Sequence, residues 1–223
     1  MIKSNIASIL KNLHKQYKNP KTELENWKNP IQFMACVILS AQATDVGVNK
    51  ITKNLFSKYK TAQDFANANL AELETYLKSI NYYKTKAKRI IDACKFIIEN
   101  YKGEMPNNIE DLIKIPGIGR KSANVIIYEA LNKTDTAGIV VDTHVTRLSQ
   151  RLGLIDPKLN NAVKIEAELQ KIVAKKEWKF YSSAIVLHGR YVCKAKKPNC
   201  EECILNKVCP SAFTFTNSEA DKK

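Results

Sequence analysis

A tight turn between two apolar helical segments carries the first residues with chemical potential. Pro116 cannot continue the preceding helix, and Gly117 and Gly119 allow a positive φ where a side chain would clash. Such a turn points several backbone N–H groups outward at the start of the next helix. That geometry binds an anion, most naturally a phosphate. The sequence therefore predicts a phosphate-binding hairpin here.

Two basic residues, Arg120 and Lys121, stand directly after this hairpin, in the first turn of the next helix. The helix dipole disfavours positive charge at that end. The pair either lies on a solvated face or is placed for a polyanion. We expect the helix N-terminus and partial burial to lower the pKa of Lys121. Both effects supply neutral amine, which is a nucleophile that can form a Schiff base.

Asp142 follows Lys121 by 21 residues and comes directly after the short apolar stretch 138–141. Taken alone, it is predicted to be the N-cap of the helix that runs through Leu152. A carboxylate can also stabilise positive charge that develops on a reacting atom. The sequence by itself does not bring Asp142 close to Lys121, so both interpretations stay open at this point.

Four of the six cysteines are crowded near the end of the chain, in the spacing Cys193-x6-Cys200-x2-Cys203-x5-Cys209. Four thiolates this close suit either tetrahedral zinc or a cubane iron–sulfur cluster. Zinc sites more often contain two CxxC pairs, and this segment contains one. Because the N-terminus does not read as a secretory signal, metal is favoured over disulfides. Cys36 and Cys94 lie in apolar helical segments and are expected in the core.

The composition points to an acidic partner. The 223 residues carry a net charge of +14, with a pI near 9.4. Residues 78–102 hold seven basic side chains against only Asp92 and Glu99. Basic surface alone would suit lipid or RNA equally well. The longest apolar run, Phe33 to Leu39, is far shorter than the ~20 residues of a membrane span.

Helical spacing of apolar residues runs through most of the chain, and no alternating strand pattern of useful length occurs. The fold class is therefore predicted to be all-α. The expected helices cover an N-terminal stripe from Ile2 to Leu13, then residues 33–43, 46–59, 70–77, 87–98, 123–131, 143–152, 163–173 and 178–191.

Four segments, in order, resemble the endonuclease III family of helix-hairpin-helix DNA glycosylases. Residues 39–45 read LSAQATD, as in the family, and residues 115–125 read IPGIGRKSANV where the family usually has LPGxGRKTANV. Residues 140–145 read VVDTHV and resemble AVDTHI. The cysteine spacing, preceded by LHGRY at 187–191, resembles the iron–sulfur loop of the same family.

This resemblance implies two helical domains with a DNA-binding cleft between them. A six-helix domain with the helix-hairpin-helix would span residues 23–133. A four-helix iron–sulfur cluster domain would combine residues 1–22 with residues 134–223. The cofactor would be a 4Fe-4S cluster held by the four cysteines.

For activity, the resemblance implies a base excision repair enzyme that is both a DNA glycosylase and an abasic-site lyase. It would remove oxidised pyrimidines from duplex DNA, with Lys121 forming the Schiff base that leads to β-elimination. Asp142 would be the second catalytic residue. Gly117, Gly119 and Arg120 would contact the DNA backbone.

Other DNA-contacting residues follow from the same resemblance. Gln42 would enter the gap left when the damaged nucleotide is flipped out. The family's second wedge is usually a leucine in a Gly-Leu-Tyr loop, and here that loop reads Ile80-Asn81-Tyr82-Tyr83. Tyr82 would stack as the wedge, or would be a half-buried loop aromatic; from the sequence both are open.

His144 is expected near the lesion, whereas His14 and His188 are expected to be structural. Three lysines in the first cysteine interval would reach the phosphate backbone: Lys194, Lys196 and Lys197. The partner would be damaged double-stranded DNA, bound by a monomer, with no membrane involved. The expected location is the cytoplasm of a bacterium, in association with the nucleoid.

Two rival functions are kept. A glycosylase of adenine-mismatch specificity shares the fold, but usually lacks the lysine and carries a glutamate on the first core helix, whereas residues 28–44 contain no Asp or Glu. A non-catalytic helix-hairpin-helix module would use the hairpin for phosphate alone and would not need Lys121.

Overall fold

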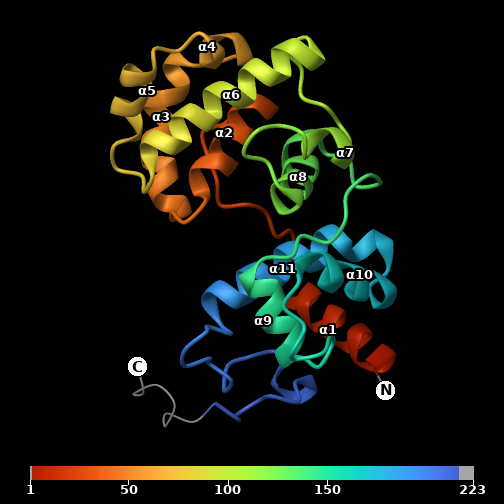
Figure 1. Cartoon of the computed structure of the whole chain (residues 1–223). Coiled ribbons are helices and arrows are strands. Elements are labelled where there is room, and N and C mark those ends of the chain that lie inside the picture. Colours follow the sequence, from red (N-terminus) through yellow and green to blue (C-terminus); the bar gives the residue numbers. More distant parts are fainter. Residues whose placement is uncertain (1, 216–223) are drawn as a thin grey trace. The chain divides into compact units, whose positions relative to one another are not determined.

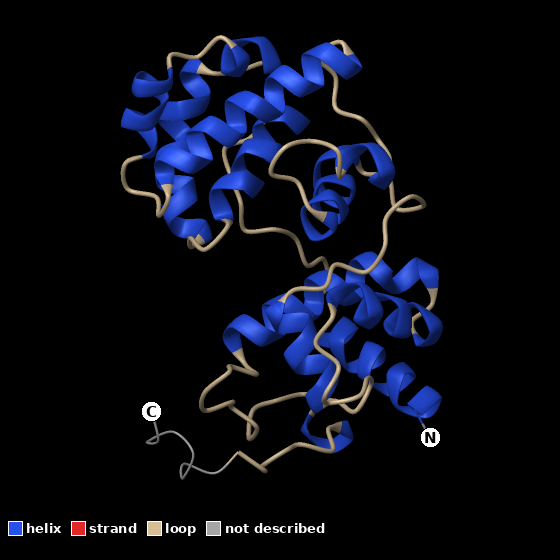
Figure 2. Ribbon diagram, viewed as in Figure 1, coloured by secondary structure: helices blue, strands red, loops and turns tan. Residues whose placement is uncertain are grey.

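The protein, seen here as a computed structural model, is described from residue 2 to residue 215, with side chains from residue 6 onward. Helices and loops make up this described part, and no strand occurs in it (Figure 2). The all-α prediction is confirmed. The chain divides into two compact units. The central unit comprises residues 22–137, and the terminal unit joins the described residues up to 21 with those from 138 onward.

The central unit is built around one apolar helix, α2 (Pro30–Ser40), in which every residue from Ile31 to Leu39 is buried (Figure 1). The helix begins where Asn29 accepts a hydrogen bond from the Gln32 backbone N–H at 3.0 Å, with Pro30 in the first turn. Both features are favoured at a helix start. Helices α3 (Asp45–Lys58), α6 (Tyr83–Tyr101) and α8 (Arg120–Ile126) pack against α2.

Helix α6 is the longest helix that the structure describes, and it packs against α4 (Ala62–Ala66) and α5 (Leu70–Leu77) as well as α2. Its buried stripe continues the apolar spacing that predicted it. The five-residue helix α4 was not predicted. Its capping box, in which Thr61 and Asp64 each accept from the other's backbone N–H, is a local signal that stands in the sequence.

The segment after the hairpin differs from its prediction. Instead of one continuous helix over 123–131, α8 gives way to a π-helical turn at Ile127–Leu131, and Asn132 ends it with a φ of 54°. The short helix α7 (Ile109–Leu112) precedes the hairpin and packs against α8. Apolar spacing indicates helix here but cannot separate α from π geometry, because both bury the same residues.

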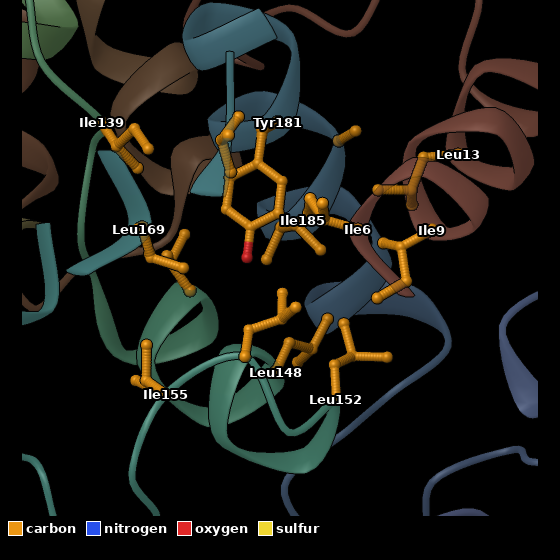
Figure 3. Packing of buried hydrophobic residues seen from close by; sticks show 14 of the residues in the cluster. Ile6, Ile9, Leu13, Ile139, Leu148, Leu152, Ile155, Leu169, Tyr181 and Ile185 are labelled. Carbon is orange, nitrogen blue, oxygen red and sulfur yellow. The ribbon is translucent and has the colours of Figure 1, made fainter. Parts of the chain in front are cut away.

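The terminal unit contains α1 (Ile2–Gln16), α9 (Thr143–Arg151), α10 (Ala162–Ile172), α11 (Trp178–Tyr191) and two short 3-10 turns, Lys175–Glu177 and Asn206–Val208. Tyr181 lies in the middle of its core, with Ile9 and Leu13 of α1 on one side and Leu169 of α10 on the other (Figure 3). The Tyr181 hydroxyl is fully buried and bonds the Ser149 hydroxyl at 2.8 Å.

Candidate functional site

The hairpin between α7 and α8 is anchored by buried side chains, and its glycines are exposed. Ile115 and Ile118 are buried, and the Ile118 N–H donates to the Ile115 carbonyl at 3.0 Å, which closes the turn. Gly117 has a φ of +85°, which favours glycine, and the aliphatic stem of Arg89 lies over it. Gly119 has a φ of −95°, so the expectation that both glycines need a positive φ is wrong for this one.

Lys121 stands in the first turn of α8 and is exposed, as is Arg120 before it. The partial burial expected for Lys121 is therefore wrong. The inward face of the same helix carries Ala123, Asn124 and Ile126, which are buried. The start of α8 has no side-chain cap, whereas α2, α3, α4, α5 and α7 each begin at an Asn or Thr that caps them. The hairpin thus presents an amine and a helix start to a ligand.

Asp142 belongs to the terminal unit and is the N-cap of α9, as predicted. Its carboxylate accepts a hydrogen bond from the Val145 N–H at 2.8 Å, and the residue is half-buried. The preceding residues Ile139, Val140 and Val141 are buried in this unit, and the Val140 N–H donates to the Ser182 hydroxyl at 3.0 Å. Asp142 is therefore held where the chain leaves the core, with its carboxylate in reach of solvent.

His144 lies on α9 within a network of polar groups. The Nη2 of Arg147 lies 3.1 Å from the Nδ1 of His144. This Arg147 nitrogen also donates to the carbonyls of Gly189 and Cys193 at 2.9 and 3.0 Å. Burial lowers the pKa of His144, against the opposing effect of the Asp142 carboxylate. The imidazole is held between Arg147 and the backbone at Gly189.

Gln42 and Tyr82 lie on two loops of the central unit. Both are exposed, Tyr82 to 68%, and both have left-handed backbones, with φ of 54° and 58°. The half-buried alternative for Tyr82 is thus wrong. The Asn81 amide donates to the Gln42 carbonyl at 3.3 Å and joins the two loops.

Sequence reasoning missed Asn81 and also Lys86, which is buried and donates to the Leu39 carbonyl at 2.8 Å. Burial lowers the pKa of Lys86, with the positive charge of Arg89 as a second cause. A signal for Lys86 did exist. It stands four residues before Ile90, on the apolar stripe of α6, although it had been counted among the surface charges.

The four cysteines of the terminal unit are half-buried, and three of them pack against its apolar core: Cys193, Cys203 and Cys209. Donors point at the sulfur atoms. The Arg151 guanidinium lies 3.2 Å from the Cys193 Sγ, and the Leu205 N–H lies 3.4 Å from the Cys203 Sγ. Burial raises the pKa of Cys203 and of Cys209, and the neighbouring thiols raise it further. Thiolates here need bound cations to offset that cost.

The donor set fits a polynuclear cluster better than one ion. In the described residues, no group of three or more His, Cys, Asp or Glu side chains is arranged to hold a single metal ion. Tetrahedral zinc draws its sulfurs to ~2.3 Å from one centre, whereas each thiolate of an iron–sulfur cluster binds a different iron. Cys36 and Cys94 are fully buried in the central unit, and burial raises the pKa of each thiol to about 12. They are core residues, as predicted.

The first interval of the cysteine loop is exposed at Lys194, Lys196 and Lys197. Arg151 fixes its backbone by donating to the carbonyls of Lys194 and Ala195 at 2.8 and 3.0 Å. Three lysines thus project from a loop whose main chain is tied to α9.

His14 and His188 act within the terminal unit. The Nε2 of His14 meets the Glu177 carboxylate at 2.8 Å, and its ring stacks on Phe180. His188 is buried between the Tyr17 hydroxyl at 3.0 Å and the Cys203 Sγ at 3.2 Å. Burial lowers the pKa of His188 to about 4. Both residues link α1 to later parts of the chain, which agrees with a structural role.

Comparison with known proteins decides the family. Residues 35–175 match the HhH-GPD superfamily of base excision DNA repair proteins, and residues 193–209 match the iron-sulfur binding domain of endonuclease III. Endonuclease III of Synechocystis sp. is 42% identical over 210 residues, which is 94% of each chain. The chain belongs to the endonuclease III family.

Solved structures agree with this membership. A non-covalent endonuclease III–DNA complex and a trapped endonuclease III–DNA covalent intermediate each match with a TM-score of 0.88 and 39% identity. Each match covers 95% of this chain and 97% of the other. The protein is a base excision repair enzyme of the endonuclease III type, a DNA glycosylase and abasic-site lyase. Its cofactor is a 4Fe-4S cluster in the segment 193–209.

The part of the chain that the structure describes contains no candidate membrane-spanning helix. Among the described residues, no helix combines the length and the apolar character that crossing a bilayer requires.

Proposed function

We propose that this endonuclease III family member removes oxidised pyrimidines from damaged duplex DNA, with Lys121 as the nucleophile. The observation that carries the proposal is the position of Lys121, exposed in the first turn of α8, next to a hairpin suited to phosphate. A phosphate held by the hairpin would bring the neighbouring sugar to the amine. The solved structure of one relative is a trapped covalent intermediate with DNA.

The proposed reaction has two stages. The Lys121 Nζ forms a bond to C1′ of the flipped nucleotide, and the glycosidic bond breaks, so that the base leaves with the bonding electrons and takes up a proton. The sugar ring then opens: the C1′–O4′ bond breaks, O4′ takes up a proton, and the protonated Schiff base formed at C1′ loses a proton from C2′. The electron pair of that C–H bond forms a double bond as the 3′ phosphate leaves, which is β-elimination. No outside oxidant or reductant is required.

Asp142 is proposed to stabilise the positive charge that develops on the sugar as the base departs. Lys121 belongs to the central unit and Asp142 to the terminal unit. His144 is proposed to contact the DNA close to Asp142. Gly117, Gly119 and Arg120 are proposed to bind the backbone, and Gln42 and Tyr82 to fill the gap left by the flipped nucleotide.

The cluster is proposed to have a structural role in this reaction. Cys193, Cys200, Cys203 and Cys209 would hold it, and it would supply four covalent cross-links to a loop with few apolar residues. The loop would in turn place Lys194, Lys196 and Lys197 against phosphates. Neither stage of the reaction requires electron transfer.

The central experiment is borohydride trapping on a panel of duplexes, each with one lesion: thymine glycol, an abasic site or an adenine mismatch. Thymine glycol and the abasic site should give a covalent complex and strand cleavage, and the adenine mismatch should give neither. Lys121→Gln should abolish trapping and excision. Lys114→Gln is the matched control, because Lys114 is an exposed lysine on the other side of the hairpin whose ion pair with Asp111 adds little stability. A Lys121→Gln enzyme that cuts abasic DNA at the wild-type rate would overturn the assignment.

Asp142→Asn separates the catalytic role of Asp142 from its capping role. Asparagine caps a helix as well as aspartate, so the hydrogen bond from the Val145 N–H is kept and the melting temperature should hold. Base release should slow by about 10²- to 10³-fold, the usual effect of losing one electrostatic contact to the transition state. A normal rate of base release in this variant would leave Asp142 as a cap only.

The adenine-mismatch alternative is disfavoured because α2, which is the first core helix, carries no carboxylate. We further propose that the protein binds DNA as a monomer, in the nucleoid of a bacterium, since relatives such as the endonuclease III of Synechocystis sp. are bacterial. Sedimentation of the protein with and without a lesion-containing duplex would test the one-to-one stoichiometry.

A further inference from the structure

The two loops that carry Gln42 and Tyr82 are each shaped by their own helices. After α2, the Ala43 N–H donates to the Ser40 carbonyl at 3.1 Å, and Thr44 caps α3. After α5, the Ile80 N–H donates to the Leu77 carbonyl at 2.8 Å, which leaves Tyr82 as the residue before α6. These local bonds fix each loop, but they do not fix one loop against the other.

Two side chains make that connection. The Asn81 Nδ2 donates to the Gln42 carbonyl at 3.3 Å, at the exposed end. Below it, the buried Lys86 ammonium donates to the Leu39 carbonyl at 2.8 Å, near the end of α2. Leu39 would otherwise present an unpaired carbonyl at a helix end, so the deeper bond is set by the fold. The Asn81 bond is the one at the loop tips.

Gln42 and Tyr82, at the tips of the two loops, are each held in an uncommon backbone conformation. A left-handed backbone costs a non-glycine residue about 1 kcal/mol or more, and such a conformation persists only where the surroundings over-determine it. Asn81 bonds the carbonyl of one left-handed residue, Gln42, and directly precedes the other, Tyr82. The bond therefore joins the Asn81 side chain to the Gln42 backbone and leaves the side chains of Gln42 and Tyr82 out of it.

We propose that Asn81 is a positioning residue, which holds the Gln42 loop to the Tyr82 loop so that the two side chains enter the gap in the duplex together. This inference rests on the proposed function. In the Gly-Leu-Tyr form of the loop, the residue before the wedge has no side chain and cannot make this bond. With the bond present, the free protein has already lost part of the loop freedom that insertion would remove, and binding to the damaged duplex is stronger for that reason.

The test is a double-mutant cycle on discrimination, defined as the Kd for an intact duplex divided by the Kd for the same duplex with a tetrahydrofuran abasic analogue. The analogue forms no Schiff base, so binding is measured without cleavage. Asn81→Ala should reduce discrimination about three- to tenfold, the range for one neutral hydrogen bond. In a Gln42→Ala background, which keeps the accepting carbonyl, Asn81→Ala should change it less than twofold, because the side chain being positioned is gone.

The matched control is Asn100→Ala, an exposed asparagine on α6 whose amide also donates to a backbone carbonyl, that of Phe96 at 2.9 Å. It should leave discrimination unchanged. A second readout is 2-aminopurine opposite the lesion, whose emission reports unstacking of the orphaned base. Asn81→Ala should lower the emission change on binding, and Asn100→Ala should not.

The outcomes separate this inference from the proposed function. Equal losses for Asn81→Ala in both backgrounds would mean that Asn81 contacts DNA or supports the fold, and would overturn the inference alone. Discrimination that is unchanged by Asn81→Ala in the otherwise wild-type protein would also overturn the inference alone. A wild-type protein that does not discriminate the two duplexes would overturn the proposed function, and this inference with it.

Discussion

The central unit folds from one continuous stretch of chain, whereas the terminal unit is assembled from both ends. In the central unit, α2 supplies a buried middle, and α2 and four other helices of this unit begin at Asn or Thr caps. The terminal unit places α1 against α10 and against the turn Asn206–Val208. From residue 193 to residue 215, Leu205 is the only buried residue.

The difference shows two ways to fix the side chains that we propose to contact DNA. The hairpin and wedge residues of the central unit are held by turns, positive φ angles and hydrogen bonds above a packed core. The cysteine loop has one buried residue, Leu205, and hydrogen bonds with Arg151 and His188 also hold it. We therefore expect the two units to respond differently to the same kinds of change.

Loss of the cluster should have the largest effect. Cys203→Ser removes one ligand from a loop that has little else to order it, and the free energy of metal binding is then lost from folding. The wild type should be brown, with about four iron and four sulfide per chain. The variant should lose colour, iron and amide protection in residues 188–209, while the central unit keeps its protection. A variant with full iron, or a colourless zinc-containing wild type, would contradict this.

Core truncation should come next. Ile9 in α1 and Leu73 in α5 are both fully buried, and replacing either by alanine should cost about 2–5 kcal/mol. Ile9→Ala should destabilise the terminal unit, including segments at the far end of the sequence, whereas Leu73→Ala should act on the central unit. Hydrogen exchange measured by region distinguishes the two. Equal loss of protection everywhere for both variants would show one cooperative unit in place of two.

Replacing each of the two hairpin glycines by alanine should change the free energy of unfolding by different, smaller amounts. Gly117→Ala forces a side chain into a φ of +85° and should cost about 1–2 kcal/mol, although the added Cβ would meet Arg89 only at ordinary contact distance. Gly119→Ala is the matched control, because its φ is −95° and nothing lies within 4 Å of an added Cβ. Chemical denaturation measures both. Equal costs for the two variants would contradict the assignment of strain to Gly117.

The smallest effect is expected on the cysteine loop surface. Lys196→Ala with Lys197→Ala should weaken binding to damaged and intact duplex alike, and should reduce the log–log salt dependence of the binding constant by about two. Titrations at several salt concentrations measure this. Weaker binding to the damaged duplex alone would place these lysines at the lesion instead of on the backbone.

The helices were predictable because the local spacing of apolar residues indicates them. Helix α11 has the bounds expected from the sequence, and the N-cap role of Asp142 was predicted from a single polar residue after an apolar stretch. The π-helical turn at Ile127–Leu131 was not predictable, since the same apolar spacing suits α and π geometry. The expected partial burial of Lys121 was wrong for a related reason, because a position in a helix does not state how deep that position lies in the fold.

The sequence by itself determined the chemistry of this protein: an amine after a glycine hairpin, a carboxylate after an apolar stretch, and four thiols at cluster spacing. Each of these is a local pattern, readable because its members are close in the chain. Only the tertiary structure decided which residues far apart in the sequence contact one another. Asn81 meets Gln42, Lys86 meets Leu39, and Arg147 meets Gly189 across 39 to 47 residues of sequence. Such contacts depend on how helices pack, and packing is fixed by the whole core rather than by any one segment.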